Sequence, residues 1–289
     1  MIYICADDYG LCDISSKRIT RCVNDGALNK VSVFPNFDTT GLDELCSSEN
    51  VEISLHINLV EGKCISQAKN INLLANEDGS FKHSFGGLFL HSIFNKRKFE
   101  AQVYEEVKSQ VLLWRDNFSV KTELLIDSHQ HTHMIPGVFK AIVRVIKEEK
   151  INVKYLRIPA EPVLPYIKTP SLYFTYNPIN IIKQWLLKFL WVVNKRHLGG
   201  YKIPTAYFFG ILFSGRMDEK RVKKILPHYL KIATKENKDI EILFHPGYLE
   251  KNEVEFSDSI CFNKFYLSKN RKTEFDTVMS QEMKVICDK

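Results

Sequence analysis

The sequence lacks the cysteine patterns of disulfide-rich and zinc-knuckle proteins. Its seven cysteines are an odd number, and no two of them are spaced Cys-x-x-Cys. A disulfide framework needs paired cysteines, and structural zinc sites favour that close spacing. The cysteines therefore favour a reducing compartment, and we expect a cytoplasmic protein.

Long hydrophobic runs are also missing. The most apolar stretch, residues 181–193, is interrupted by Lys183, Gln184 and Lys188, and it is shorter than the roughly 20 apolar residues that cross a bilayer. Its apolar positions recur at helical spacing, which predicts an amphipathic helix that covers a core. Contact of this helix with a membrane surface stays open as the alternative. Residues 2–6 are apolar directly after Met1 without a basic leader, so we expect no secretory signal and no transmembrane segment.

Charge is close to balanced. Forty Lys and Arg face 34 Asp and Glu, which gives a net charge of +6, and the basic residues are dispersed along the chain. Dispersed bases are typical of solvated helix faces, so we expect no nucleic-acid partner. A hydrophobic content of 45% and a charged content of 26% are ordinary for a globular enzyme.

Short β-rich runs alternate with helical runs throughout the chain. We predict strands over residues 2–6, 31–34, 52–57, 124–128, 155–158, 206–209 and 240–244. Three further patterns predict helices around residues 103–114, 139–146 and 275–286. Such alternation indicates parallel strands joined by helices, either in a barrel or in an open sheet. No Gly-x-Gly-x-x-Gly follows the first strand, which removes the main support for dinucleotide binding. We expect one domain over residues 1–289, with loop insertions near 62–97 and 159–205.

The first strand ends in two adjacent carboxylates, Asp7 and Asp8. Neighbouring carboxylates repel each other and are costly to desolvate, and a metal ion or a shared proton relieves that cost. A solvated turn is the alternative for this pair. His56 lies near the end of another strand, where a metal ligand and a hydrogen-bonded core histidine both stay open.

The sharpest signal is Asp-Ser-His-Gln-His-Thr-His at 127–133. In an extended chain His129, His131 and His133 face one way, so we expect the three imidazoles to converge on one pocket. Neutral imidazole suits zinc and other first-row metals, and Asp127 can act as the outer carboxylate partner that ligating imidazoles need.

Two more strand ends carry polar residues before proline, Arg157 and His245. Five of the nine histidines thus fall at or just after predicted strands. The carboxyl ends of parallel strands form the active face of such folds. The joint placement therefore predicts an active site there.

These motifs resemble the YdjC/ChbG-like carbohydrate deacetylases, a family that includes the hopanoid-associated HpnK proteins. The resemblance rests on Ala-Asp-Asp-Tyr-Gly at 6–10, His-Ile-Asn-Leu-Val-Glu-Gly at 56–62 and Asp-Ser-His-Gln-His-Thr-His-Met-Ile-Pro at 127–136. Shorter matches lie at 157–159, 209–210 and 244–248. The resemblance implies a single-domain, distorted (β/α) barrel of seven or eight strands, similar to that of the NodB-type deacetylases, and a possible homodimer.

The resemblance further implies one divalent metal ion held by Asp8, His56 and His129. Zinc or magnesium is expected first, and manganese, cobalt or nickel stay open. Asp7 is then the general base and His245 the acid that protonates the leaving amine. Arg157 either orients Asp7 or binds substrate. The groups expected to contact substrate or to support the ligands are Tyr9, which replaces a common phenylalanine, with Asn58, Glu61, Asp127, His131 and His133.

The expected reaction is hydrolysis of an N-acetyl group on an amino sugar, in a chitooligosaccharide or a related glycan or glycolipid. Three alternatives stay open from the sequence: a metal-dependent phosphoesterase or amidohydrolase, a glycoside hydrolase, and a non-catalytic protein that binds carbohydrate or metal. A glycoside hydrolase needs two carboxylates on either side of a sugar, which chain neighbours such as Asp7 and Asp8 supply poorly.

Overall fold

The computed structural model of the chain describes residues 1–37, 41–48, 50–117, 123–256, 267 and 269–287. All seven predicted strands are confirmed, with ends that differ by at most a few residues. They are β1 (Ile2–Tyr9), β2 (Lys30–Val33), β3 (Glu52–Ile57), β4 (Leu124–Ser128), β5 (Val153–Leu156), β6 (Tyr207–Phe209) and β7 (Ile240–Phe244).

The seven strands form one sheet in the order β5-β4-β3-β2-β1-β7-β6, and every neighbouring pair is parallel. Nearly every strand residue is buried, because helices cover the sheet and both faces of its strands lie inside the protein. Within the described ranges β5 and β6 are the two edges. The predicted distorted barrel is therefore confirmed as a curled half-barrel of seven strands.

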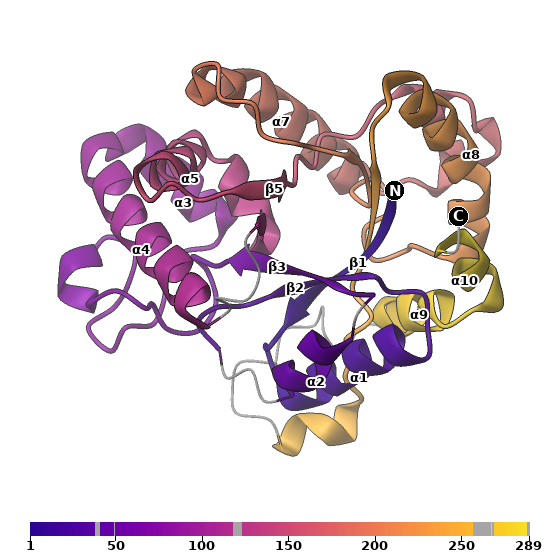
Figure 1. Cartoon of the computed structure of the whole chain (residues 1–289), viewed down its shortest axis with the longest axis horizontal. Coiled ribbons are helices and arrows are strands. Elements are labelled where there is room, and N and C mark those ends of the chain that lie inside the picture. The colour runs from indigo at the N-terminus through magenta and orange to yellow at the C-terminus, as the bar shows by residue number, and fades with distance from the viewer. Residues whose placement is uncertain (38–40, 49, 118–122, 257–266, 268, 288–289) are drawn as a thin grey trace.

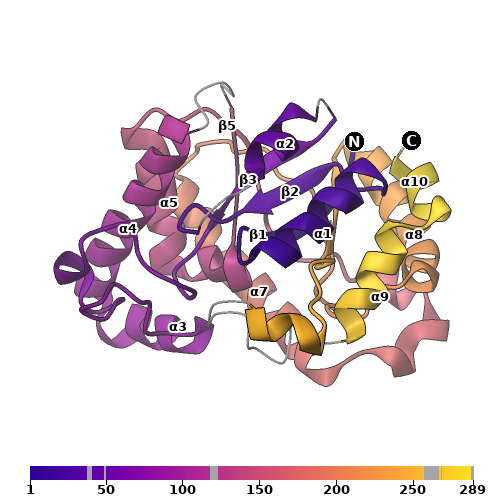
Figure 2. The same cartoon turned by 90° about the horizontal axis from the view of Figure 1, so that it is seen from below.

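Helices flank the sheet on both sides (Figure 1). One group gathers beside β3, β4 and β5, and the other lies beside β1 and β7. Figure 2 shows α1 and α9 side by side, as in Figure 1. The helices are α1 (Asp13–Asn24), α2 (Leu42–Ser47), α3 (Phe85–Phe94), α4 (Lys96–Asn117), α5 (Pro136–Glu148), α6 (Leu164–Ile167), α7 (Pro178–Asn194), α8 (Glu219–Glu236), α9 (Lys269–Val278) and α10 (Gln281–Cys287).

The two segments expected as insertions contain structure of their own. Residues 62–97 include the 3-10 helix η1 (Ala68–Ile71) and the helix α3. Residues 159–205 include α6, η3 (Pro170–Thr175), α7 and η4 (Lys195–Leu198). The predicted amphipathic helix at 181–193 is confirmed as α7 and is longer at both ends. Two further 3-10 helices are η2 (His129–Met134) and η5 (Lys251–Phe256).

The C-terminal pattern at 275–286 is two helices and not one, because α9 ends at Val278 and α10 starts at Gln281. The backbone N–H of Ser280 bonds the carbonyl of Thr277, which closes a tight turn between them. Free thiols are present at Cys5, Cys12, Cys22, Cys46 and Cys64. None of the helices in the described part of the chain is both long enough and apolar enough to span a membrane.

Candidate active site

The residues singled out from the sequence lie at one edge of the sheet. Asp8 is near the end of β1, His56 near the end of β3, and His129 directly after β4. Arg157 and His245 follow the last residues of β5 and β7. Because all the strands are parallel, their carboxyl ends meet at this edge, where α/β proteins place their active sites.

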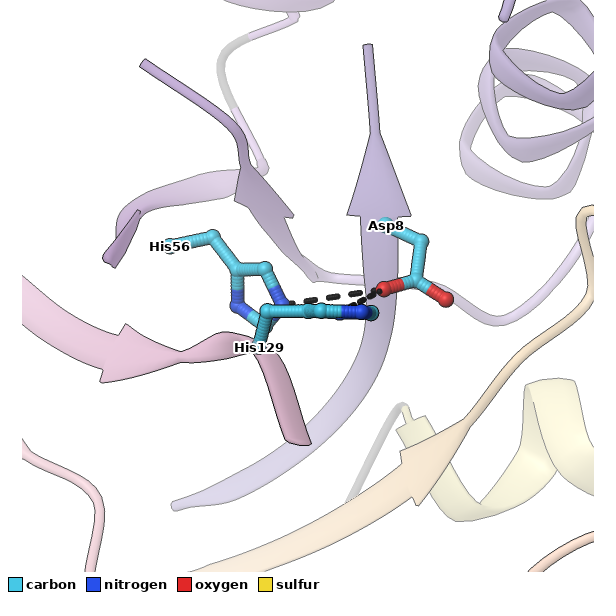
Figure 3. Close-up of side chains that lie close together, drawn as sticks. All are labelled: Asp8, His56 and His129. Atoms are coloured by element: carbon cyan, nitrogen blue, oxygen red, sulfur yellow. Dashed lines mark hydrogen bonds and ion pairs between the residues drawn. The ribbon is translucent and has the colours of Figure 1, made fainter. Parts of the chain in front are cut away.

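Asp8, His56 and His129 converge on one point (Figure 3). The Oδ1 atom of Asp8 is 2.9 Å from Nδ1 of His129 and 3.7 Å from Nε2 of His56. All three side chains are buried, and one donor atom from each lies within 4.8 Å of the others. Two atoms bonded to one zinc ion at about 2.0–2.2 Å lie roughly 3–3.5 Å apart, so the spacing suits a shared cation.

His56 has the features of a metal ligand. Its Nδ1 is 2.7 Å from Oδ1 of Asp127, which orients Nε2 toward Asp8. The Nε2 atom is buried and has no hydrogen-bond partner among the residues that the structure describes. A ligating imidazole typically uses one nitrogen for the metal and donates from the other to a carboxylate. The donor set therefore fits a divalent cation.

A second group, Asp7 with His56 and Asp127, is also close enough to share a cation. Its carboxylates are already engaged. Both oxygens of Asp7 accept from Arg157, at 2.7 and 2.8 Å. Asp127 accepts from the hydroxyls of Ser32 and Ser54. The group around Asp8 is the better cation site, because its unpartnered imidazole nitrogen faces the carboxylate.

Electrostatics favour the charged forms in this cluster. Burial alone would lower the pKa of His56, but the carboxylates of Asp7, Asp127 and Asp8 outweigh it and raise the pKa to about 9. Burial would likewise raise the pKa of Asp8, yet His129, His56 and Arg271 hold it well below its usual range. The carboxylates thus favour a positive charge on His56, at the point where a cation would lie.

Asp8 adopts a left-handed backbone conformation, with φ of 72°. Aspartate tolerates this region better than most residues. The sheet register also shifts here, between Ala6 and Tyr9. While Oδ1 of Asp8 faces the histidines, its Oδ2 accepts a hydrogen bond of 2.7 Å from Arg271. Arg271 therefore fixes the carboxylate so that a single oxygen is presented to the cluster.

Arg157 lies wholly inside the protein, and its guanidinium forms a fork with the carboxylate of Asp7. Two roles were left open for this arginine, and these contacts support the first of them, the orientation of Asp7. The same guanidinium also contacts Glu241 at 2.6 Å and Asp127 at 3.2 Å. Arg157 thus joins three buried carboxylates beneath the site.

Lys30 completes this buried charge network. Its Nζ is 2.9 Å from Oε1 of Glu241 and 3.4 Å from Oδ2 of Asp127, and none of the three side chains is exposed. Burial would raise the pKa of Glu241, but Arg157 and Lys30 lower it to about 2. Every charge of the network is thus paired, as buried charges must be.

The predicted convergence of three extended imidazoles is wrong. Residues 129–134 form the 3-10 helix η2, and Gln130 and His131 have positive φ values that turn the chain. His131 packs edge-on against Phe208, and burial holds its pKa well below the usual value. Only the first histidine of the motif joins Asp8.

His133 is a structural histidine. Its Nε2 is 2.9 Å from the carbonyl oxygen of Arg157, which can only accept, so Nε2 carries the proton. Its Nδ1 accepts from the hydroxyl of Ser128 at 2.5 Å. Burial lowers the pKa of His133 to about 4, which keeps the ring neutral. The ring therefore ties β4 to the chain after β5.

The remaining candidates lie around the rim. Asn58 is buried and its side chain holds the backbone of Val60 and Glu61, so it shapes the turn that carries Glu61. The Glu61 carboxylate is partly exposed and lies 3.9 Å from Nε2 of His129.

Tyr9 does not join the cluster. Its hydroxyl lies near Gly41 and hydrogen-bonds Thr20 of α1, because the register shift after Ala6 turns it toward that helix.

His245 is partly exposed and is held by Glu274 of α9. The carboxylate of Glu274 accepts from the backbone N–H of His245 at 2.6 Å and lies 3.6 Å from its Nδ1. Glu274 and Arg271 were missed in the sequence, as were Lys30 and Glu241. A signal did exist for the first two: Arg271 and Glu274 share a helix face with the apolar residues Phe275 and Val278, and a charged residue on a buried face needs a partner.

A cavity apart from the cluster lies elsewhere in the structure. It has a volume of about 660 Å³ and is lined by residues that include Ile2, Leu230 and Val285. Ile2 begins β1, whereas Asp8 is near its end, so the cavity and the cluster are at opposite ends of that strand. Its lining carries none of the clustered histidines.

The parallel half-barrel and the carboxylate–imidazole cluster at its strand ends define an α/β protein with a candidate cation-binding active site. The chain belongs to the YdjC-like protein family, whose sequence model matches residues 1–289.

Several curated relatives carry the name carbohydrate deacetylase. The one from Danio rerio is 25% identical over 265 residues, covering 86% of this chain and 82% of the relative. The one from Mus musculus is 26% identical and covers 86% of this chain and 78% of the relative. The one from Thermoanaerobacter pseudethanolicus is 25% identical, and the match covers 64% of this chain and 73% of the relative.

A solved structure shares the fold. It is described as a cellobiose-phosphate cleavage protein of Enterococcus faecalis, with a TM-score of 0.66 and 18% identity. The match covers 99% of this chain and 93% of that one.

Proposed function

We propose that this chain is a metal-dependent carbohydrate deacetylase, which hydrolyses the N-acetyl group of an amino sugar and releases acetate. The observation that carries the proposal is the convergence of Asp8, His56 and His129, with an unpartnered imidazole nitrogen aimed at a carboxylate. Membership of the YdjC-like family and relatives named carbohydrate deacetylase support it.

The three ligands would hold one divalent cation, which supplies Lewis-acid polarisation of the acetyl carbonyl and lowers the pKa of water. Two imidazole nitrogens favour zinc over magnesium, which prefers oxygen ligands. We therefore expect zinc to be the tightest of the candidate ions, with cobalt, nickel and manganese as working substitutes and magnesium the weakest.

Asp7 is the proposed general base. Its two oxygens are held by Arg157, so the carboxylate has a fixed orientation beside the cluster. In the reaction a water oxygen forms a bond to the acetyl carbon, and Asp7 accepts the proton that this water loses. Arg157 acts through Asp7 as a positioning residue, because its side chain is buried and does not reach the substrate side.

His245 is the proposed general acid. The carbon–nitrogen bond of the amide breaks only if the nitrogen gains a proton, since an amide anion is a very poor leaving group. His245 is partly exposed at the same strand edge, and Glu274 lies 3.6 Å from its Nδ1. In this role His245 would give a proton to the amide nitrogen, and the nearby carboxylate of Glu274 would stabilise the imidazolium before the transfer.

The test measures acetate released from N,N'-diacetylchitobiose by protein stripped with a chelator and resupplied with single metals. We expect no release from the stripped protein and release with zinc or a substitute ion. His228→Ala is the matched control, because His228 lies on α8 and outside the cluster. The variant should behave like the native protein.

Two other outcomes contradict the proposal. Metal binding without acetate release from this substrate or from N-acetylated glycolipids would favour a binding protein. Release of phosphate from phosphoester substrates, without acetate release, would favour the phosphoesterase alternative.

A further inference from the structure

Residues 162–217 carry no acidic side chain. This stretch of 56 residues contains seven Lys and Arg, whereas all 34 acidic residues of the chain lie elsewhere. The whole chain has a net charge of only +6. The segment is therefore positive because it lacks acidic residues, although its basic residues are no denser than in the rest of the chain.

Exposed apolar side chains are concentrated in the same segment. Of the 17 large hydrophobic residues exposed in the described part of the chain, 11 lie between Leu164 and Tyr201. On α7 they form one stripe with helical spacing, made of Ile179, Ile182, Trp185, Phe189 and Val192. Figure 1 shows α7 along the upper edge of the molecule. Soluble proteins rarely expose large contiguous apolar patches unless something covers them.

The opposite side of α7 is firmly packed. Leu187 and Leu190 are buried in the core, and two side-chain amides anchor the helix. Gln184 donates to the carbonyl of Glu161, and Asn194 donates to the carbonyl of Met134. The exposed stripe therefore belongs to a helix that is firmly packed on its other side. Its residues are exposed although the helix already has a core to pack against.

Basic side chains lie against aromatic rings of this helix. The Nζ atom of Lys188 is 5.6 Å from the ring centre of Trp185, and that of Lys195 is 5.4 Å from the ring of Trp191. Helices that lie in a membrane interface combine exposed Trp and Phe with Lys and Arg in this way. The long lysine stems also let the ammonium groups reach phosphate while the stems contact apolar surface.

We propose that the outer face of α7, together with the exposed residues of segments 164–174 and 195–202, docks on the surface of an anionic lipid bilayer. This set of residues is called the docking face below. Its apolar stripe would enter the region between headgroups and acyl chains, and its bases would pair with lipid phosphates. A second copy of the chain fits less well. A two-fold interface would set the same acid-free, basic segment against itself, with no carboxylate of its own to pair.

The inner side of α7 connects the docking face to the candidate active site. Asn194 of α7 donates to the carbonyl of Met134, the last residue of η2, and η2 begins with His129. One helix thus packs with its inner side on the 3-10 helix that carries His129 and presents apolar residues outward. If the proposed deacetylase function holds, this arrangement favours an N-acetylated amino sugar carried on a membrane lipid.

The test is co-flotation of the whole protein with vesicles, which requires no enzymatic activity. Vesicles of phosphatidylcholine alone are compared with vesicles that contain phosphatidylglycerol. We expect binding to the anionic vesicles at least about tenfold stronger, because each Lys or Arg near such a surface contributes favourably. The variants are Trp185→Asn with Phe189→Asn, and Lys195→Glu with Arg196→Glu. Each should reduce binding by about tenfold or more.

The matched control is Leu230→Asn with Val285→Asn, two exposed apolar residues beside the cavity at the other end of β1. This variant should bind vesicles like the native chain. Two results overturn the proposal: no binding to anionic vesicles, or equal losses in control and test variants. A measurement of the protein's molecular mass in solution adds a third. If the native chain is a dimer and the Trp185 and Phe189 changes convert it to a monomer, the docking face binds a second copy of the chain. Deacetylase assays decide the proposed function independently of all three.

Discussion

The interior beneath the strand ends and the outer face of α7 are opposites in composition. Lys30, Arg157 and Glu241 are fully buried charges, whereas Trp185 and Phe189 are 60% and 63% exposed aromatic residues. Buried charges cost desolvation free energy, and exposed apolar surface promotes association. The buried charges are all paired within the fold, but the exposed stripe faces outward. The difference indicates that the first region is complete in the single chain and that the second is built to meet another surface.

The largest expected effect comes from breaking the cluster while leaving α7 intact. Asp8→Asn and His56→Ala should each weaken zinc affinity by more than about 100-fold, because even changes to groups that only support a ligand cost 10–100-fold. Acetate release should fall to background. Calorimetric zinc titration and an acetate assay measure the two effects, with His228→Ala as control. Tight zinc binding by His56→Ala would show that the ligand set is wrong, and vesicle binding should be unaffected.

Asp7→Asn should separate catalysis from metal binding. Loss of a general base lowers kcat by roughly 10²–10⁴-fold. Zinc affinity should change by only a few fold, because Asp7 is held by Arg157 and is not among the three proposed ligands. Steady-state kinetics and zinc titration of the same preparation test this. Full activity in the variant would remove Asp7 from the mechanism.

Lys30→Met should destabilise the whole fold without touching α7. Removing one partner of a buried ion pair costs about 3–5 kcal/mol, since the other charge stays buried. Glu241 and Asp127 would both lose a cation. Urea unfolding measures the change. The double change Lys30→Met with Glu241→Leu should recover part of the loss, and strict additivity of the two single changes would contradict the pairing.

The same network should make stability depend on pH in acid. The pKa of Glu241 is lowered to about 2 from an ordinary 4.5, so its contribution is fully present above about pH 4.5. As the pH falls from 4.5 toward 2, this contribution is lost. The unfolding free energy of Glu241→Gln should therefore decline less steeply than that of the native chain over this window. Parallel declines would show that Glu241 is not held in its charged form.

The smallest expected effect lies on the docking face. Trp185→Asn with Phe189→Asn should change the unfolding free energy by at most about 0.5 kcal/mol per site, because surface substitutions rarely exceed that. Thermal unfolding measures it, with Leu230→Asn and Val285→Asn as the comparison. A loss of several kcal/mol would mean that the stripe packs against the chain itself. The contrast between the two regions would then disappear.

Much of the fold could be predicted from local pattern. Buried parallel strands are continuous apolar runs, so all seven could be recognised from sequence. The break between α9 and α10 could not be predicted from the sequence. The apolar residues before and after Ser280 keep helical spacing, and serine is as compatible with a continuous helix as with a turn. Closure was also undetermined: the curl of the sheet and its two open edges depend on packing between strands far apart in sequence.

The site was predictable where its residues lie at strand ends and hidden where they come from other elements. Asp8 and His56 lie near the ends of strands and His129 directly follows one, and parallel topology gathers such ends. The pairing of Arg271 with Asp8 spans 263 residues, and no local signal predicts a partner at that distance. The expectation for His131 was wrong because it assumed an extended chain, whereas Gln130 and His131 turn with positive φ. Lys30 and Glu241 lie in strands far apart in the sequence, and no local pattern predicts that their charges meet in the interior.

That long pairing has a consequence for how the protein is made. During synthesis on the ribosome Asp8 emerges long before α9, because Asp8 and Arg271 are 263 residues apart. The sheet is likewise incomplete until β7 pairs with β1. A nascent chain therefore holds Asp8 without its arginine and His245 without its glutamate. Binding of the proposed cation in the final geometry must therefore wait for α9. A chain that ends before α9 would keep Asp8, His56 and His129 yet leave Asp8 without its anchor, Arg271.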